Sequence, residues 1–365
     1  MRYVSVNYNY SPDFNSPENW VKRTRAYTGI LEILAKKNTV IAIKQINYKG
    51  VYTYNGVEHH FVEFGKKKTL FPLKLNRYIK NLDPDIIILQ GLHNSLQFIQ
   101  LHFLLKKNTK VIAQHHAEKP FTGIKKYLQK LADRYIDAYL FASHDMGMDW
   151  VKKGNLSSPQ KIHEVMELSS VFYPIEKTTA LAKTGATGNP LFLWVGRLNA
   201  NKDPLNIVKA FLKFTYSCPA ATLYMIYHTD ELLTEIIELA KGHPNKNAVH
   251  LVGKVPNDEL LYWYNSADFI VSGSHYEGSG TAICEAMSCE CVPVVTSISS
   301  FRMITDNGNC GLLYEAGNEE ALLAVLKQTQ QVDIQEKRKL SLDYFKSNLS
   351  FEAIAGRIEE IAGSL

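Results

Sequence analysis

Short apolar runs alternate with longer amphipathic segments along both halves of this 365-residue chain. In the first half, the apolar runs predict buried strands at 3–7, 40–44, 85–89, 110–114 and 138–142. The 3.6-residue periodicity between them predicts helices at 18–37, 96–106 and 124–134. Asn55-Gly56, between β-rich runs at 51–54 and 59–64, predicts a hairpin turn. Because strands joined by helices pair in parallel, this half is expected to be a doubly wound α/β sheet.

The second half repeats the pattern and predicts a second Rossmann-like sheet. Its expected strands are 191–195, 222–226, 249–252 and 267–272, and its expected helices are 204–214, 231–241 and 259–265. Thr, Ala and Gly replace bulky residues at 177–189, which predicts a linker. The expected domains are therefore 1–180 and 190–345, followed by a C-terminal helical segment at 346–365. Neither half has the GxGxxG fingerprint after its first strand, which argues against a nicotinamide or flavin enzyme.

Composition indicates an ordinary cytosolic protein. Hydrophobic residues make up 45% and charged residues 21% of the chain, and no apolar run reaches the roughly 20 residues that a membrane-spanning helix needs. The chain opens with Met1-Arg2-Tyr3-Val4-Ser5, a strand pattern, so no signal peptide is expected. The five cysteines form no CxxC pair, and we interpret them as reduced and structural.

Charge is distributed unevenly. Residues 1–180 carry a net charge of +11, whereas residues 181–365 carry −6. This asymmetry favours contact between the first half and an anionic partner, such as lipid headgroups at the inner face of the cell membrane or a phosphate-bearing acceptor. A solvated basic surface is an equal alternative. Nucleic acid is not expected, because Lys66-Lys67-Lys68 is the one tight basic cluster and no nucleic-acid motif accompanies it.

The segment from Glu277 to Glu285 carries the clearest chemical signal. It reads Glu277-Gly278-Ser279-Gly280-Thr281-Ala282-Ile283-Cys284-Glu285 and follows an expected strand. A helix is expected at 282–287 with Ile283 and Met287 on its inner face, and Thr281 and Glu285 then share one face. Glycines let backbone amides approach a ligand at the helix start, where an anion is favoured. A carboxylate one turn later can accept hydrogen bonds from two ribose hydroxyls. The combination predicts a site for a nucleotide diphosphate.

With this E-x7-E stretch, the Glu285-Ala286-Met287 helix and the Pro293-Val294-Val295 strand, the chain resembles the retaining GT-B glycosyltransferases of family four, the glycosyl transferases group 1. The resemblance implies an α/β fold of two Rossmann-like doubly wound domains facing a central cleft. The first would be the acceptor side and the second would bind the nucleotide-sugar, with the C-terminal helix at 351–361 crossing back to the first. It also implies a retaining, metal-independent hexosyltransferase, without a cofactor, that moves a sugar from a nucleotide diphosphate-sugar to a hydroxyl.

The resemblance assigns roles to residues of the second half. Val195-Gly196-Arg197-Leu198 and the trailing Lys202 match the family's GRL segment, so Arg197 and Lys202 would neutralise the donor pyrophosphate as the sugar bond breaks. Glu277 would contact hydroxyls of the transferred sugar, and Glu285 would hold the ribose. The remaining expected donor contacts are Gly196, Val255, Gly278, Ser279, Gly280 and Thr281. At 251–256, the main chain around Val255 would meet the nucleobase.

In the first half, the expected catalytic residue is a histidine at the end of a strand. Val111-Ile112-Ala113-Gln114-His115-His116 ends in two histidines, and the family places one near the reacting carbon of the sugar. We assign this role to His116, with His115 as the alternate. A structural histidine at a strand end is the competing interpretation.

Some positions depart from the family pattern. The expected loop at 7–12 has no glycine, and Glu290 stands where relatives commonly have glycine after the EAMxC motif.

Two alternative functions remain open. One is a catalytically silent nucleotide-sugar-binding partner protein, and the other is a glycosidase with Glu277 and Glu285 as its paired carboxylates. The leading hypothesis is polysaccharide, lipopolysaccharide or other glycoconjugate synthesis on a saccharide or lipid-linked saccharide acceptor.

Overall fold

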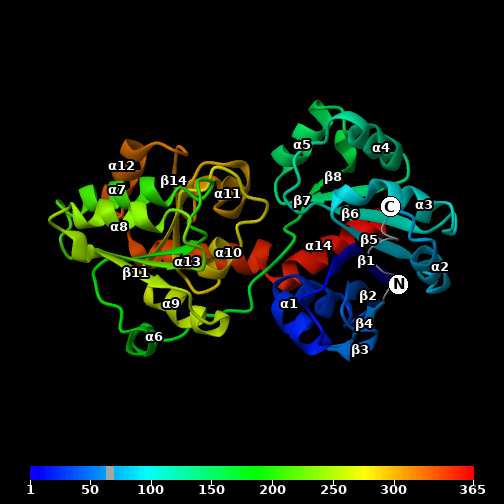
Figure 1. Ribbon diagram of the computed structural model, residues 1–365, viewed down its shortest axis with the longest axis horizontal. Coiled ribbons are helices and arrows are strands. Elements are labelled where there is room, and N and C mark those ends of the chain that lie inside the picture. Colours follow the sequence, from blue (N-terminus) through cyan, green and yellow to red (C-terminus); the bar gives the residue numbers. More distant parts are fainter. Residues whose placement is uncertain (63–69) are drawn as a thin grey trace. The chain divides into compact units, whose positions relative to one another are not determined.

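The computed structural model describes residues 1–62 and 70–365, and these form two compact units (Figure 1). Unit 1 consists of Met1–Ser169 and Phe351–Leu365, and unit 2 consists of Ser170–Ser350. The Lys66-Lys67-Lys68 cluster and the expected strand end at Phe64 lie outside the described residues. Among the described residues, no helix has the length and apolar character that a membrane crossing requires.

In the described part of unit 1, eight strands form one sheet in the order β3-β4-β2-β1-β5-β6-β7-β8. The strands are β1 (Arg2–Ser11), β2 (Thr39–Ile46), β3 (Gly50–Tyr54), β4 (Val57–Phe61), β5 (Ile86–Gln90), β6 (Lys110–Gln114), β7 (Ala138–Phe141) and β8 (Ile162–Glu164). All neighbouring pairs are parallel except β3 and β4, which form the expected antiparallel hairpin. Its turn residues Asn55 and Gly56 both have positive φ, of 46° and 82°, as a two-residue hairpin loop requires.

Helices join the parallel strands of unit 1. They are α1 (Pro17–Leu34), α2 (Leu73–Asn81), α3 (Ser95–His102), α4 (Gly123–Asp133), α5 (His144–Lys152) and α14 (Phe351–Ser364). The chain starts α1 with Ser16, whose hydroxyl accepts from the backbone of Asn19, and with Pro17 in the first turn. The C-terminal helix α14 packs beside α1, and a Cβ added at Gly29 of α1 would stand 2.6 Å from the Phe351 ring. Glycine therefore permits the close approach of these two helices.

Unit 2 contains a six-stranded, fully parallel sheet in the order β11-β10-β9-β12-β13-β14. The strands are β9 (Leu191–Gly196), β10 (Thr222–Tyr227), β11 (Val249–Gly253), β12 (Phe269–Ser272), β13 (Val292–Thr296) and β14 (Leu312–Tyr314). Numbered within the unit, this is the 3-2-1-4-5-6 order of the Rossmann fold. Phe192 and Phe269 stack at 5.0 Å where β9 meets β12 in the core.

The helices of unit 2 cover this sheet. They are α6 (Lys177–Thr184), α7 (Pro204–Phe214), α8 (Leu233–Lys241), α9 (Leu260–Ser266), α10 (Thr281–Met287), α11 (Ser299–Ile304), α12 (Glu319–Gln328) and α13 (Ile334–Tyr344). Residues 177–189, interpreted above as a linker, thus include a helix, and α6 packs on α9. The chain enters unit 2 near Ser170 instead of near residue 180. The reason is local: Asn265 of α9 accepts from the backbone of Ile175 at 2.8 Å and donates to the carbonyl of Tyr173 at 3.1 Å.

Two of the departures from the family pattern have a backbone explanation. β1 continues to Ser11 instead of ending near Asn7, with an irregularity in its pairing to β2 between Val6 and Tyr10. The glycine-free stretch is therefore mostly strand. Glu290 has a φ of +63°, a conformation in which glycine carries no steric penalty.

Candidate functional site

The candidate donor site lies at the topological switch point of unit 2, where the strand order reverses between β9 and β12. Ligands of open α/β sheets bind at the carboxyl ends of the strands beside such a point. Gly196 is the last residue of β9, and Arg197 follows it. β12 ends at Ser272, five residues before Glu277. The topology thus brings the two segments predicted from the sequence to the same edge of the sheet.

Hydrogen bonds join the loop after β9 to the loop after β12. Asn201 donates its side-chain amide to the carbonyl of Tyr276 at 3.0 Å, and its own carbonyl accepts from the backbone of His275 at 2.9 Å. A Cβ added at Gly273 would lie 3.2 Å from the carbonyl oxygens of Lys202 and Asp203. Glycine at this position therefore allows the two loops to approach closely.

As a result, Lys202 and Glu277 form a hydrogen-bonded ion pair. Their side chains are 26% and 14% exposed, so the pair is partly shielded yet reachable from solvent. Arg197 lies on the same edge and is exposed, and among the described residues its side chain forms no hydrogen bond or ion pair. An exposed cation that makes no internal bond, in the same loop as a partly buried lysine, suits the recognition of an anion.

The start of α10 has the expected glycine geometry. Gly280 precedes the helix with a φ of 59°, and an added Cβ would stand 2.7 Å from the ring of Phe301. Gly278 and Ser279 are buried, and Thr281 opens the helix. The prediction that Ile283 and Met287 face inward is confirmed, because they are 2% and 0% exposed.

Glu285 is held by a residue that the sequence analysis did not identify. The Tyr264 hydroxyl, on α9, donates to Glu285 Oε2 at 2.7 Å. Tyr264 is fully buried, and burial together with the neighbouring carboxylate raises its pKa well above the usual value. The phenol therefore stays protonated and keeps the O–H that it donates to the carboxylate. In the sequence, Tyr264 has the spacing of an apolar core position, so no signal distinguished it.

Val255 and Asp203 follow two strands of the same sheet. Val255 is half-buried and follows β11, after Gly253 with a φ of 81°. Asp203 precedes Pro204 at the start of α7, with a φ of 47° and no side-chain capping bond. Its carboxylate lies instead 3.3 Å from His275 Nε2.

His116 lies one strand away from the switch point of unit 1, which falls between β1 and β5. It follows the end of β6, and its Nε2 is 2.8 Å from Oε1 of Gln90, the last residue of β5. Its Nδ1 is hydrogen-bonded to Glu167 Oε2. Both ring nitrogens thus face acceptor oxygens, which favours the imidazolium form with two N–H donors.

The surroundings act on the pKa of His116 in opposite directions. Burial lowers it, but the hydrogen bond and negative charge of Glu167 outweigh burial, so the pKa is raised above the usual value. The His116 side chain is 27% exposed, whereas that of Glu167 is 6% exposed. A partly exposed, protonatable ring fixed by a buried carboxylate is suited to a polar ligand.

His115 has a different environment. Its side chain is 1% exposed, its ring stacks on Phe141 at 4.6 Å, and its Nε2 lies 2.7 Å from the carbonyl oxygen of Glu118. Burial lowers its pKa. Of the two histidines, His115 is thus a core residue and His116 is the one with solvent access.

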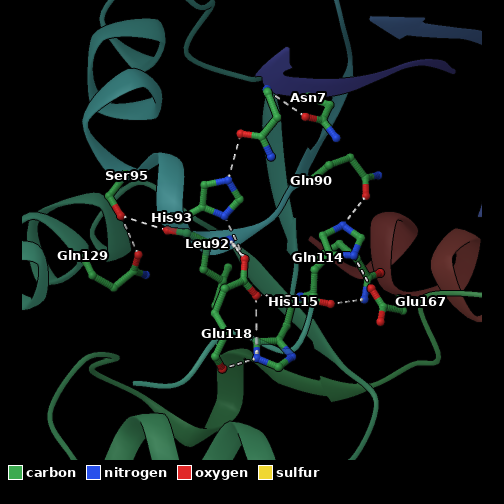
Figure 2. Close-up of polar contacts among 12 residues, drawn as sticks. Asn7, Gln90, Leu92, His93, Ser95, Gln114, His115, Glu118, Gln129 and Glu167 are labelled. Atoms are coloured by element: carbon green, nitrogen blue, oxygen red, sulfur yellow. Dashed lines mark hydrogen bonds and ion pairs between the residues drawn. The ribbon is translucent and has the colours of Figure 1, made fainter. Parts of the chain in front are cut away.

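Glu118 connects the segments of this network (Figure 2). Its carboxylate accepts from the backbone N–H groups of Leu92 at 2.8 Å and His116 at 2.7 Å, and it lies 3.1 Å from His93 Nδ1. Burial raises the pKa of Glu118, but its bonds to His93 and to the His116 backbone, together with the charge of His115, lower it to about 2. Neither Glu118 nor Glu167 was predicted. Their partners lie far away in the sequence or are backbone N–H groups, and neither kind leaves a mark in the sequence.

Known proteins are similar to parts of this chain or to all of it. Residues 176–339 match the family model described as glycosyl transferases group 1. Over 104 residues, the chain is 31% identical to the O-antigen chain mannosyltransferase B of Escherichia coli, a match that covers 28% of this chain and 26% of that protein. The matched segment therefore spans about a quarter of that relative.

Solved structures resemble the whole chain. Sucrose-phosphate synthase from Thermosynechococcus elongatus matches with a TM-score of 0.74 at 16% identity, covering 100% of this chain and 98% of that one. Anabaena HepE in complex with UDP and glucose matches with a TM-score of 0.71 at 14% identity, covering 100% of both chains. The resemblance drawn from the sequence is thus confirmed: the chain has the GT-B fold, and its residues 176–339 are similar to the glycosyl transferases group 1.

Proposed function

We propose that this protein is a retaining glycosyltransferase that moves a sugar from a nucleotide diphosphate-sugar to a hydroxyl of a saccharide or lipid-linked saccharide. The observation that carries the proposal is the junction of the loops after β9 and β12. It joins Glu277 to Lys202, in the loop that begins at Arg197, within the segment similar to group 1. Synthesis of a polysaccharide or another glycoconjugate fits the named activity of the E. coli relative.

In this proposal, the cations act on the leaving diphosphate. Arg197 and Lys202 neutralise its charge as the bond to the sugar breaks, so the residues themselves supply the stabilisation without a metal ion. Lys202 also orients Glu277, whose second oxygen contacts hydroxyls of the sugar. Glu285, fixed by Tyr264, accepts from the ribose hydroxyls. The backbone around Val255 meets the base, and Gly196, Gly278, Ser279, Gly280 and Thr281 surround the diphosphate.

His116 is proposed to contact the transferred sugar near its reacting carbon. Glu167 and Gln90 fix its ring, which defines the direction of its N–H groups. The leaving phosphate would accept the proton of the attacking hydroxyl, so that the new bond forms on the face from which the diphosphate departs. No protein nucleophile takes part in this route.

The donor site can be tested by isothermal titration and thermal shift with UDP, GDP and ADP. UDP is the first probe because a structural neighbour was solved with it. A diphosphate at 100 times its dissociation constant should stabilise the protein by about 2.7 kcal/mol. Arg197→Ala and Glu285→Gln should abolish the shift. Lys209→Ala and Glu238→Gln likewise remove one positive and one negative charge, but at exposed positions on α7 and α8. These control variants should retain the shift.

The outcomes separate the alternatives. If one diphosphate binds, sugar transfer is measured with the matching nucleotide-sugars, and His116→Ala should abolish transfer while donor binding remains. Donor binding without transfer to any saccharide acceptor would favour the silent partner protein. If no nucleotide binds and the protein hydrolyses glycosides, the glycosidase replaces the proposal. The existing contacts of Glu277 with Lys202 and of Glu285 with Tyr264 argue against paired hydrolytic carboxylates.

A further inference from the structure

Helix α4 exposes three large apolar residues, whereas a glutamine, an alanine and an aspartate face inward. Ile124 and Tyr127 are 72% and 71% exposed, and Leu131 is 38% exposed. By contrast, Gln129, Ala132 and Asp133 are all at most 2% exposed. The three apolar side chains are spaced at i, i+3 and i+7, so they form a stripe along one outward side of the helix. A surface helix of a globular domain ordinarily shows the reverse pattern.

Polar bonds hold the inner side of α4, so the apolar stripe is not needed for packing. Gln129 accepts from the Ser95 hydroxyl at 2.8 Å and donates to the Tyr139 hydroxyl at 3.1 Å, and Figure 2 shows the Ser95–Gln129 contact. Asp133 accepts from the backbone of Ser157 at 2.9 Å. Because these bonds fix the helix from within, the stripe is available for another purpose.

The exposed apolar stripe continues onto the end of α3 and is bordered by positive charge. Phe103 is 70% exposed, and its ring lies 5.9 Å from that of Tyr135, one helical turn beyond Leu131. Residues 119–134 contain five basic residues and one acidic residue, the buried Asp133. Lys125, Lys130 and Arg134 are all exposed. We call Phe103, Ile124, Tyr127 and Leu131, with Lys125, Lys130 and Arg134, the α4 surface.

We propose that the α4 surface binds a membrane rich in anionic lipids, with its apolar side chains at the boundary between headgroups and acyl chains. Amphipathic helices with large apolar residues beside Lys and Arg bind this boundary, where the long basic side chains reach the headgroups. A second copy of the chain is a poorer occupant, because two-fold pairing of this surface would set its cations against each other. The inference goes beyond the proposed function and does not depend on it.

The test is co-sedimentation of the protein with phosphatidylcholine vesicles that contain or lack phosphatidylglycerol. The wild type should bind the anionic vesicles, and high salt should release most of the bound protein but leave a fraction held by the apolar side chains. Lys125→Gln with Lys130→Gln should weaken this binding about 25-fold, since each basic residue near an anionic surface contributes about fivefold. Ile124→Ser with Tyr127→Ser should reduce it further and remove the fraction that resists salt.

Controls of the same chemistry lie elsewhere on the chain. Tyr216→Ser removes a side chain that is 65% exposed, and Lys209→Gln removes an exposed charge, both in unit 2. These variants should bind vesicles like the wild type. Equal binding by the wild type and both α4 double variants would overturn the proposal. The proposal would also be overturned if light scattering showed that the wild type forms concentration-dependent dimers and that the α4 variants do not. The response to UDP should persist in the α4 variants, so failure of either proposal can be recognised separately.

Discussion

At the scale of single residues, the pair of His116 and Glu167 makes a direct prediction. Glu167 holds the pKa of His116 above the usual value against the opposing effect of burial. In Glu167→Gln the burial remains and the charge is lost, so the pKa of His116 should fall below its wild-type value. A histidine NMR titration measures this, with the exposed Glu352→Gln on α14 as the control.

The sign of the stability effect follows from the direction of this shift. Because the folded-state pKa is raised, the pair stabilises the fold at pH below about 6.5, and this contribution disappears as the pH rises through the folded-state value. Glu167→Gln should therefore destabilise the protein more at pH 5.5 than at pH 8 in urea unfolding. A pKa of His116 that does not move would contradict the proposed coupling.

Lys44 offers a second test, in which the contribution to stability changes with pH in the opposite direction. The lysine is 8% exposed, its Nζ lies 4.8 Å from the centre of the Trp20 ring, and burial lowers its pKa to about 8. Between about pH 8 and 10.5 the unfolded chain holds a proton that the folded protein lacks, so stability due to this residue rises with pH. At pH 7 the buried charge costs about 3 kcal/mol, partly offset by the aromatic ring.

Lys44→Met should therefore stabilise the protein at pH 7 by about 1–3 kcal/mol, and the difference from wild type should shrink towards pH 10. Urea unfolding at a series of pH values measures the difference. Lys209→Met, at an exposed position, should show a difference that stays constant with pH. The same constant difference for Lys44→Met would rule out a buried ammonium.

At the scale of elements, the start of α10 depends on Gly280. An alanine there must adopt a φ near 59° and also place its Cβ 2.7 Å from Phe301. Gly185, at the end of α6, has a similar φ of 66° but nothing within 4 Å of an added Cβ. Both alanine variants should lose about 1–2 kcal/mol through backbone strain, and Gly280→Ala should lose about 1–3 kcal/mol more through overpacking. Equal losses in urea unfolding would mean that the Phe301 contact imposes no cost.

Local patterns made most elements of the fold predictable. Of the strands at the two switch points, β5, β9 and β12 begin as continuous apolar runs, and the Asn55-Gly56 turn has a specific backbone requirement. The helix at 177–184 was missed because its short, Thr- and Ala-rich sequence resembles a linker, and only packing against α9 specifies it. Contacts such as Tyr264–Glu285 and His116–Glu167 join residues 21 and 51 positions apart, and no local signal marks such pairs.

At the scale of the whole molecule, two units with separate cores share one chain, and α14 returns the C-terminus to unit 1. Its inward residues include Ile354, Ile358 and Ile361, each at most 3% exposed, and Glu359 accepts from Asn38 at 2.8 Å. Although α14 follows unit 2 in sequence, its buried surface stabilises unit 1. A charge or cavity in α14 should consequently affect a region more than 180 residues away in the chain.

Ile358→Ala should therefore destabilise unit 1 by about 2–5 kcal/mol, the usual cost of removing a buried isoleucine side chain. Hydrogen exchange followed by mass spectrometry should show faster exchange across residues 1–169, with unit 2 close to wild type, because each core opens as its own cooperative unit. Leu326→Ala, in a buried position on α12, is the matched control and should accelerate exchange in residues 170–350 instead. If Ile358→Ala accelerated exchange equally in both units, the two cores would unfold together, and α14 would stabilise the entire chain instead of unit 1 alone.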